Sequence, residues 1–184
     1  MREILFRGKR ADNGEWVYGY YTELPVGSLG ATIFSNDDEI VCEDTASYII
    51  KVFEKQHSNY SNGNPLQVIE CENYEVIPET VGQYTGLTDK NGKKIFEGDI
   101  LKCHDNPKDL VKVVFGGFDV VDTDTECPVD TVIGWHYEVI PTDELSAVEP
   151  FCLSMPLTKS YIEYCHMEVI GNIHDNPELL EVSE

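Results

Sequence analysis

The stretch at residues 76–102, VIPETVGQYTGLTDKNGKKIFEGDILK, constrains the fold more than any other part of the sequence. Two runs of apolar, aromatic and β-branched residues lie on either side of Asn91 and Gly92. An Asn-Gly pair tolerates positive φ at both central positions of a type I′ turn, so it is the strongest short-range signal for a β-hairpin. The stretch therefore predicts an antiparallel hairpin. The glutamate, glycine and aspartate at 97–99 predict a second turn that leads into a further strand.

The rest of the sequence repeats this pattern of short β-rich runs separated by turn residues. Another Asn-Gly pair is flanked by residues 2–10 and 16–21, two glycines are flanked by residues 110–115 and 118–121, and a long strand is predicted at residues 131–140. Such a series is typical of all-β proteins. We therefore expect a mainly β fold with a small β-barrel-like architecture of short antiparallel strands and hairpins.

Helical signals are few. A helical turn is expected near residues 143–145, and Asn176 followed by Pro177 is suited to cap and begin a short helix. We expect at most two short helices in the whole chain.

The length and the apolar content bound the domain organisation. A chain of 184 residues forms one ordinary domain or two small ones, and a hydrophobic share of 41% is sufficient for a core. We expect a single unit, with two packed β subdomains at about 1–77 and 78–184 as the alternative. No apolar run approaches the roughly 20 residues that span a bilayer, and the N-terminal residues do not read as a signal peptide. The expected location is therefore the cytoplasm, with no membrane contact.

The formal net charge of −21 is distributed unevenly along the chain. Residues 11–89 contain two lysines against fourteen acidic residues, and residues 113–184 contain one lysine against fifteen. The basic residues cluster instead at 1–10 and 90–112. Phosphate binding needs clustered Lys and Arg, so this charge disfavours direct binding of nucleic acid and suits a basic protein partner.

The central hairpin is the candidate interaction site. Three lysines at its tip form a small basic cluster that can dock on an acidic neighbour, including another copy of this chain. A plain solvated turn is the alternative. The residues expected to form this interaction hairpin are Tyr84, Thr85, Lys90, Asn91, Lys93, Lys94 and Asp99.

No sequence motif indicates catalysis or metal binding. The six cysteines are spread without a C-x-x-C spacing. Cysteine directly precedes histidine at Cys103-His104 and Cys165-His166, but adjacent strand residues point to opposite faces and do not easily hold one metal. There is also no G-x-S-x-G, no H-E-x-x-H and no phosphate-binding glycine-rich loop. We therefore expect no catalytic residue, no cofactor and no metal, and we interpret the cysteines as small buried thiols.

Three blocks of the sequence resemble the YopX family, whose members are mostly encoded by phages and prophages of bacteria. The blocks are QYTGLTDKNGKKIFEGDI at residues 83–100, FRGKR with DNGEWVYGYY at residues 6–21, and VIGNIHDNPELL at residues 169–180. The resemblance implies a YopX-like unit in the cytoplasm of a bacterial host cell. It implies no established biochemical activity.

Four classes of function compete, and the last of them, direct binding of nucleic acid through residues 2–10 and 90–112, is disfavoured by the net charge. The first is a phage or prophage accessory protein that binds other proteins and associates with itself as a homo-oligomer. The second is an acidic nucleic-acid mimic that blocks a host DNA-binding or defence protein, and the third is an uncharacterised enzyme with a dispersed site. The acidic composition and the lack of a catalytic motif favour the first, so we expect a binding module and not an enzyme.

Overall fold

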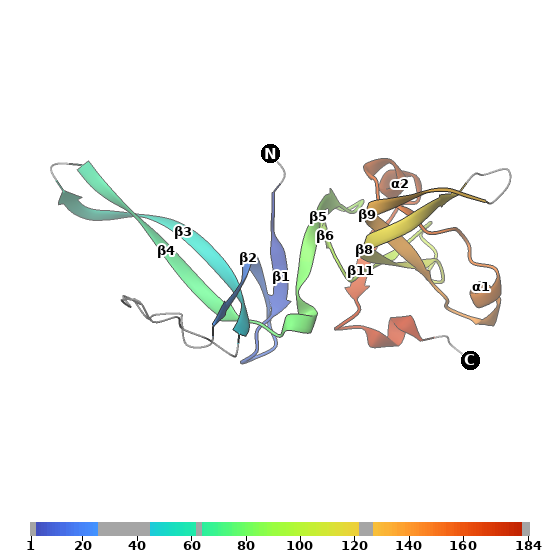
Figure 1. The fold of residues 1–184 in the computed structure, drawn as a ribbon, viewed down its shortest axis with the longest axis horizontal. Helices are drawn as coiled ribbons and strands as arrows, with labels where there is room; N and C mark the ends of the chain where they lie inside the picture. The colour runs from blue at the N-terminus through green and yellow to red at the C-terminus, as the bar shows by residue number, and fades with distance from the viewer. Residues whose placement is uncertain (1–2, 26–44, 62–63, 122–126, 182–184) are drawn as a thin grey trace. The chain divides into compact units, whose positions relative to one another are not determined.

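The computed structural model describes residues 3–25, 45–61, 64–121 and 127–181. The chain divides into two compact units, Glu3–Gln83 and Tyr84–Glu184 (Figure 1). The described residues form mostly β-strands, with two short α-helices and two short 3-10 helices. These observations confirm the mainly β class and the expected number of α-helices. The choice between one unit and two packed subdomains stays a prediction.

The unit Glu3–Gln83 is built from antiparallel strands in the order β4-β3-β2-β1: β1 (Phe6–Lys9), β2 (Trp16–Pro25), β3 (Thr45–Ser61) and β4 (Asn64–Glu75). Strand β2 pairs with only the first part of β3, so the remainder of β3 pairs with β4 alone as a long twisted ribbon (Figure 1). The 3-10 helix η1 (Pro78–Thr80) then leads into β5 (Gly82–Thr88), whose first residues pair with β1. The core of this unit is small and centres on Val17, Ile49 and Val76.

Gly19 sets how closely β2 approaches β3. A Cβ atom at this position would lie 2.3 Å from the backbone oxygen of Ile50 and 2.9 Å from Cγ2 of Ile49. Only a residue without a side chain fits there, because a strand carbonyl cannot move away without breaking its ladder.

The unit Tyr84–Glu184 contains the central hairpin and a five-stranded antiparallel sheet. The hairpin pairs the later part of β5 with β6 (Lys94–Phe96). The sheet has the order β10-β9-β8-β7-β11: β7 (Asp99–Lys102), β8 (Leu110–Val121), β9 (Pro128–Ile140), β10 (Met155–Pro156) and β11 (Glu168–Asn172). The helical elements are α1 (Glu144–Val148), α2 (Lys159–Tyr164) and the 3-10 helix η2 (Pro177–Leu180).

The expected barrel-like closure is wrong for the residues that the structure describes. The five-stranded sheet ends at β10 on one edge and β11 on the other, and each of them pairs with a single neighbour. One face of the sheet is instead covered by α2, because Val111, Val113 and Tyr137 form one buried cluster with Ile162 and Met167. A helix that buries the apolar face removes the need for the sheet to close on itself.

The two glycines at 116–117 do not form the expected turn. Both lie inside the continuous strand β8, where Gly116 pairs with Gly134 and Gly117 pairs with Ile133. Neither has a positive φ. Pairing with β9 over nearly the whole length of β8 therefore overrides the local turn signal.

The central hairpin is confirmed, but its turn is not of type I′. Gly92 has a φ of +83°, whereas Asn91 does not have a positive φ. The amide of Gly92 donates to the carbonyl of Asp89 at 3.0 Å, as in a type I turn with aspartate first and glycine last. The side chain of Asp89 completes the turn, because its Oδ1 accepts from the amides of Asn91 (2.8 Å) and Lys93 (2.9 Å). Its other oxygen, Oδ2, accepts from the buried amide of Val169 in β11 at 3.0 Å.

Of the two helix starts expected from the sequence, one has a side-chain cap and the other does not. Helix α1 begins where expected, since Oδ1 of Asp143 accepts from the amide of Ser146 at 2.9 Å and Ser146 Oγ accepts from the amide of Asp143. The amide of Ser146 and the ammonium of Lys108 lower the pKa of Asp143 to about 2. Pro177 begins η2 as expected, but Asn176 does not cap it with its side chain.

Of the helices in the described residues, none combines the length and the apolarity that crossing a bilayer would need.

Replacing Gly19 by alanine is expected to destabilise the unit Glu3–Gln83 by about 3 kcal/mol, because the new methyl group overlaps a backbone carbonyl. The measurement is urea unfolding followed by the fluorescence of Trp16 in a Trp135→Phe background. Gly134→Ala is the control, since nothing lies within 4 Å of a Cβ there. Equal, small effects of both substitutions would contradict the close approach at Gly19.

Replacing Asp89 by alanine is expected to destabilise the unit Tyr84–Glu184 by about 3 kcal/mol, because the buried amide of Val169 and two turn amides lose their acceptor. Asp89→Asn keeps one acceptor oxygen, so it is expected to cost about half as much. Urea unfolding followed by Trp135 fluorescence in a Trp16→Phe background measures both. If Asp89→Ala unfolds like the wild type, the carboxylate is not the link between the turn and β11.

Candidate functional site

The residues of the interaction hairpin lie together in the unit Tyr84–Glu184, and the aromatic pair at its base is buried. The ring of Tyr84 packs on Phe96 with centroids 5.5 Å apart, and Lys94 Nζ lies 5.0 Å from the centre of the Tyr84 ring. Thr85 is also buried, and its hydroxyl donates to the carbonyl of Ile95 at 2.9 Å. Tyr84 and Thr85 therefore hold the two strands together.

Asp99 fixes the second turn, in agreement with its interpretation as a turn residue. Its side chain is buried, and Oδ2 accepts from the amide of Phe96 at 2.8 Å. Gly98 has a φ of +76°, which a side chain would make strained.

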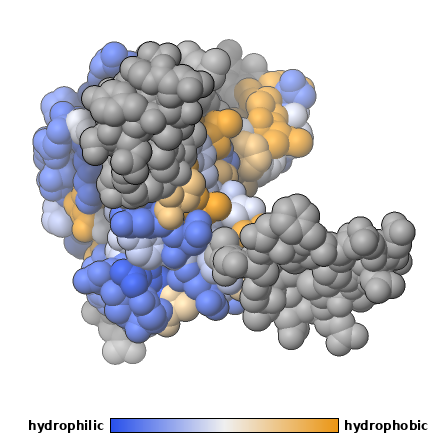
Figure 2. Space-filling model, turned by 90° about the vertical axis from the view of Figure 1, so that its left-hand side faces the viewer, coloured by the Kyte–Doolittle hydropathy of each residue, from blue (hydrophilic) through white to orange (hydrophobic). Residues whose placement is uncertain are grey.

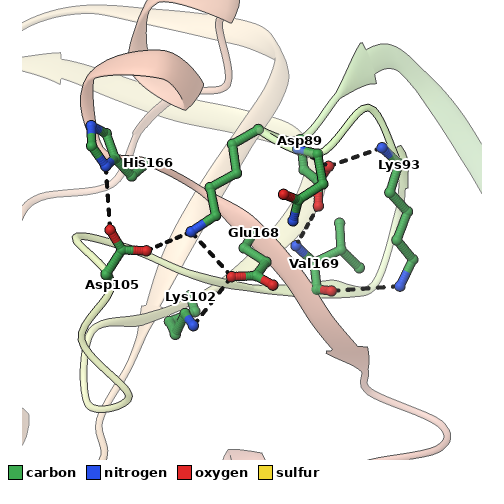
Figure 3. A network of polar contacts seen from close by, with 9 residues as sticks. Asp89, Lys93, Lys102, Asp105, His166, Glu168 and Val169 are labelled. Carbon is green, nitrogen blue, oxygen red and sulfur yellow. Dashed lines mark hydrogen bonds and ion pairs between the residues drawn. The ribbon is translucent and has the colours of Figure 1, made fainter.

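Lys90 and Lys93 at the tip of the hairpin contact other parts of the same unit. Figure 3 shows Lys93 beside Val169. Lys90 Nζ lies 2.5 Å from Oδ1 of Asp105 and 3.1 Å from Oε2 of Glu168. Lys93 Nζ lies 3.5 Å from the carbonyl of Val169. Of the expected basic cluster, Lys90 therefore pairs with acidic residues of its own unit, and Lys93 reaches a backbone carbonyl. Whether the hairpin also binds a second molecule stays a prediction.

The acidic residues that receive Lys90 belong to a wider polar network. Glu168 Oε2 also lies 3.2 Å from Nζ of Lys102, and Asp105 Oδ2 lies 3.3 Å from Nδ1 of His166 (Figure 3). Five charged or titratable side chains from four segments of the chain thus share one surface.

The two Cys-His dipeptides, far apart in sequence, meet beside this network. The amide of His104 donates to the carbonyl of Cys165 at 2.6 Å. Both cysteines are buried and both histidines are exposed, so neighbouring residues do point to opposite sides, as the sequence predicted. The described residues contain no group of three or more His, Cys, Asp or Glu side chains arranged to hold a metal ion.

The backbone at this junction is unusual. His104, Asp105 and His166 have φ values of 54°, 56° and 51°, and they are the non-glycine residues with positive φ in the described chain. Such conformations cost of the order of 1 kcal/mol each and persist only where surrounding contacts impose them. Their concentration in two touching loops marks this junction as the candidate functional site.

Charge pairing sets the protonation of the network. Hydrogen bonds from Lys90, and then from His166, lower the pKa of Asp105 below its ordinary value. Lys90 and Lys102 likewise lower the pKa of Glu168, while both carboxylates raise the pKa of Lys90. The network therefore holds two carboxylates and an ammonium group in their charged forms at neutral pH.

The thiols beneath the junction are protonated. Burial, followed by the proximity of Cys165 and Cys152, raises the pKa of Cys103 to about 12. A thiol of this kind is not a nucleophile at neutral pH. The site can orient the His166 imidazole with a carboxylate, but its thiols cannot supply the reactive thiolate that a cysteine enzyme needs.

The sequence did not predict this junction. Its one available signal was the repetition of Cys-His, and we interpreted the two dipeptides separately. Asp105 and Glu168 could not be recognised as site residues in the sequence, because only contacts between distant segments bring them into the network.

Replacing Lys90 by methionine is expected to raise the pKa of both Asp105 and Glu168 toward ordinary values. Both carboxylates lose the ammonium group that contributes most to lowering their pKa. Carboxylates with a lowered folded-state pKa stabilise the fold above the unfolded-state pKa, and this contribution is lost as the pH falls through the folded-state pKa. In the variant this contribution is smaller, and its loss is complete at a higher pH, because the folded-state pKa lies closer to the unfolded-state value. Carbon-13 NMR titration of the carboxyl groups measures the shift, with Lys159→Met as a control on an exposed helix pair. Unchanged titration of both carboxyls would rule out the network in solution.

Comparison with known proteins places the chain in a family. The model of the family described as YopX protein matches residues 5–181. Among solved structures, the chain is similar to that of protein EF1440 from Enterococcus faecalis, with 26% sequence identity, a TM-score of 0.49 and coverage of 98% of this chain and 100% of that chain. Curated proteins give no match. Because the family match spans nearly all of the sequence, this chain belongs to the YopX family.

Proposed function

We propose that this protein acts by binding other proteins and not by catalysis. In this proposal it is an accessory protein of a phage or prophage, works in the cytoplasm of the bacterial host, associates with a second copy of itself and engages a basic protein partner. Membership of the YopX family is compatible with the proposal and does not by itself specify a partner.

The observation that carries the proposal is the excess of carboxylates over cations. The chain has 34 Asp and Glu against 13 Lys and Arg, so even complete one-to-one pairing leaves 21 carboxylates without a cation of this chain. The basic segment at 90–112 is already used internally: Lys102 contacts Glu168, Lys108 contacts Asp143, and Lys112 contacts Glu138. A field of this sign favours a cationic protein surface as the partner.

The described surface is largely hydrophilic on the face shown in Figure 2, with hydrophobic residues gathered in places. One apolar surface supports self-association. Strand pairing puts Phe115 with Trp135 and Gly117 with Ile133 on the face of β8–β9 that is buried at Val113 and Tyr137. Phe115 is 54% exposed and Ile133 is 75% exposed, so the apolar face continues beyond the core.

The net charge makes association between two copies dependent on the salt concentration. Each copy carries −21, so two copies repel each other at low salt. Contact through Phe115 and Ile133 does not depend on charge, and screening the repulsion strengthens it.

Sedimentation equilibrium tests the self-association. We expect dimers whose population increases when salt is raised to about 0.5 M. Ile133→Asp is expected to abolish them, while Val148→Asp, at an exposed apolar residue of α1, is expected to leave them intact. A wild-type protein that stays monomeric at every salt concentration overturns self-association. Dimers that survive Ile133→Asp place the contact elsewhere.

A separate experiment tests the basic partner. Tagged protein is exposed to purified host DNA-binding proteins and washed at about 0.5 M salt, beside an acidic control protein of the same charge density. Retention by this protein and not by the control supports the proposal. If the retained partner also releases duplex DNA in proportion to the added protein, the nucleic-acid mimic becomes the better description. Equal retention by both baits overturns specific binding.

A further inference from the structure

A cavity of about 340 Å³ opens between α2, β9 and the irregular segment that precedes β10. Its inner wall belongs to the main core, since Cys103, Tyr137 and Met167 are almost completely buried. Leu153 and Tyr164 also line it but are 55% and 81% exposed, so the cavity is accessible from solvent beside them. The opening is therefore a surface cleft with an apolar inner wall, of the kind in which small ligands bind.

The lining consists mostly of polarisable side chains and, within the described residues, contains no Lys, Arg, Asp or Glu. Besides the aromatic rings it contains three cysteines, and burial raises the pKa of Cys103 to about 12 and that of Cys152 to about 11. Protonated thiols and methionine side chains are polarisable, and they adapt well to aromatic surfaces.

The imidazole at the rim of the cavity has its polar partner outside the lining. His104 lines the rim, where its ring makes an edge contact with Phe151 at 5.8 Å, and its Nδ1 lies 3.0 Å from Oδ2 of Asp109. No Lys, Arg, Asp or Glu is among the lining residues in the described chain. A charged ligand would therefore lose its hydration without gaining a counter-charge.

We propose that this cavity binds a small neutral aromatic molecule about the size of two fused rings. The volume is roughly twice that of the engineered cavity of about 150 Å³ that holds benzene, and it lies within the range of ligand sites. Aromatic side chains such as Tyr161 and Phe151 offer ring faces and edges for stacking, and the sulfur atoms of Met155 and Cys165 surround them. This site is separate from the surfaces proposed for protein binding and does not depend on them.

The test follows the methyl signals of Met155 and Met167 by NMR of the full chain labelled at the methionine methyl carbon. Both residues line the cavity, and Met→Leu substitutions assign their signals. The probes are indole, its anionic analogue indole-3-acetate, its cationic analogue tryptamine and N-acetyltryptophanamide. We expect indole to shift both methyl signals saturably and to bind at least about tenfold more tightly than either charged analogue, because a charged group in the cavity gives up hydration without gaining a counter-charge.

Binding of the cationic analogue, tryptamine, is the decisive control. The net charge of −21 attracts tryptamine and repels indole-3-acetate, so weaker binding of both means that the cavity itself rejects charge. If indole gives no saturable shift, or if tryptamine binds as tightly as indole, the proposal is overturned. If N-acetyltryptophanamide binds at least about tenfold more tightly than indole, the cavity prefers a tryptophan side chain with its peptide groups, and the assignment to a free small molecule is overturned.

Two variants connect binding to the cavity. Cys152→Phe, at a half-buried position of the wall, is expected to fill the space and weaken indole binding at least about tenfold. Cys71→Phe, at an exposed cysteine of the other unit, is expected to leave binding unchanged. Should Cys152→Phe not fold, Tyr164→Ala removes an exposed ring from the rim and is expected to weaken binding about threefold. Indole binding that is unaffected by Tyr164→Ala and by Cys152→Phe overturns the assignment to this cavity.

Discussion

The carboxylate of Asp89 connects the turn of the central hairpin to a strand that lies 80 residues further along the chain. One of its oxygens organises the turn, and the other satisfies the buried amide of Val169. This position of β11 brings Glu168 to the ammonium group of Lys90. A single buried carboxylate therefore links the hairpin turn to an edge strand that β7 also holds by pairing, and so to the polar network.

The junction of the two Cys-His dipeptides separates two chemical environments over the distance of one residue. Cys103 and Cys165 turn inward and line a neutral cavity, whereas His104 and His166 turn outward toward carboxylates. The positive φ values of both histidines are part of this division. An exposed charged network and a sulfur-rich cavity are thus held by the same backbone segments, and changes in one are expected to affect the geometry of the other.

Lys90 and Lys93 have partners within their own unit, and this changes the interpretation of the basic hairpin. In the sequence, Lys90 and Lys93 appear as a free cationic tip, which suits an acidic neighbour. In the structure that neighbour is found within the same unit, at Asp105, Glu168 and the Val169 carbonyl. Part of the hairpin's cationic charge is therefore already paired within the unit, which leaves less of it for the proposed contact with a second copy.

The sequence alone determined the β class, the hairpin around Asn91-Gly92, the start of α1 and the family, because turn chemistry, capping and signature blocks are properties of neighbouring residues. It did not determine the turn type, where the Asp89 side chain outweighs the Asn-Gly preference, or the path of β8, where pairing with β9 outweighs Gly116-Gly117. The seven residues of the expected interaction hairpin lie together, but their polar contacts were not predictable. The network and the cavity were decided by the tertiary structure, since both depend on contacts between segments as far apart as Asp105 and His166 and on burial that no local pattern encodes.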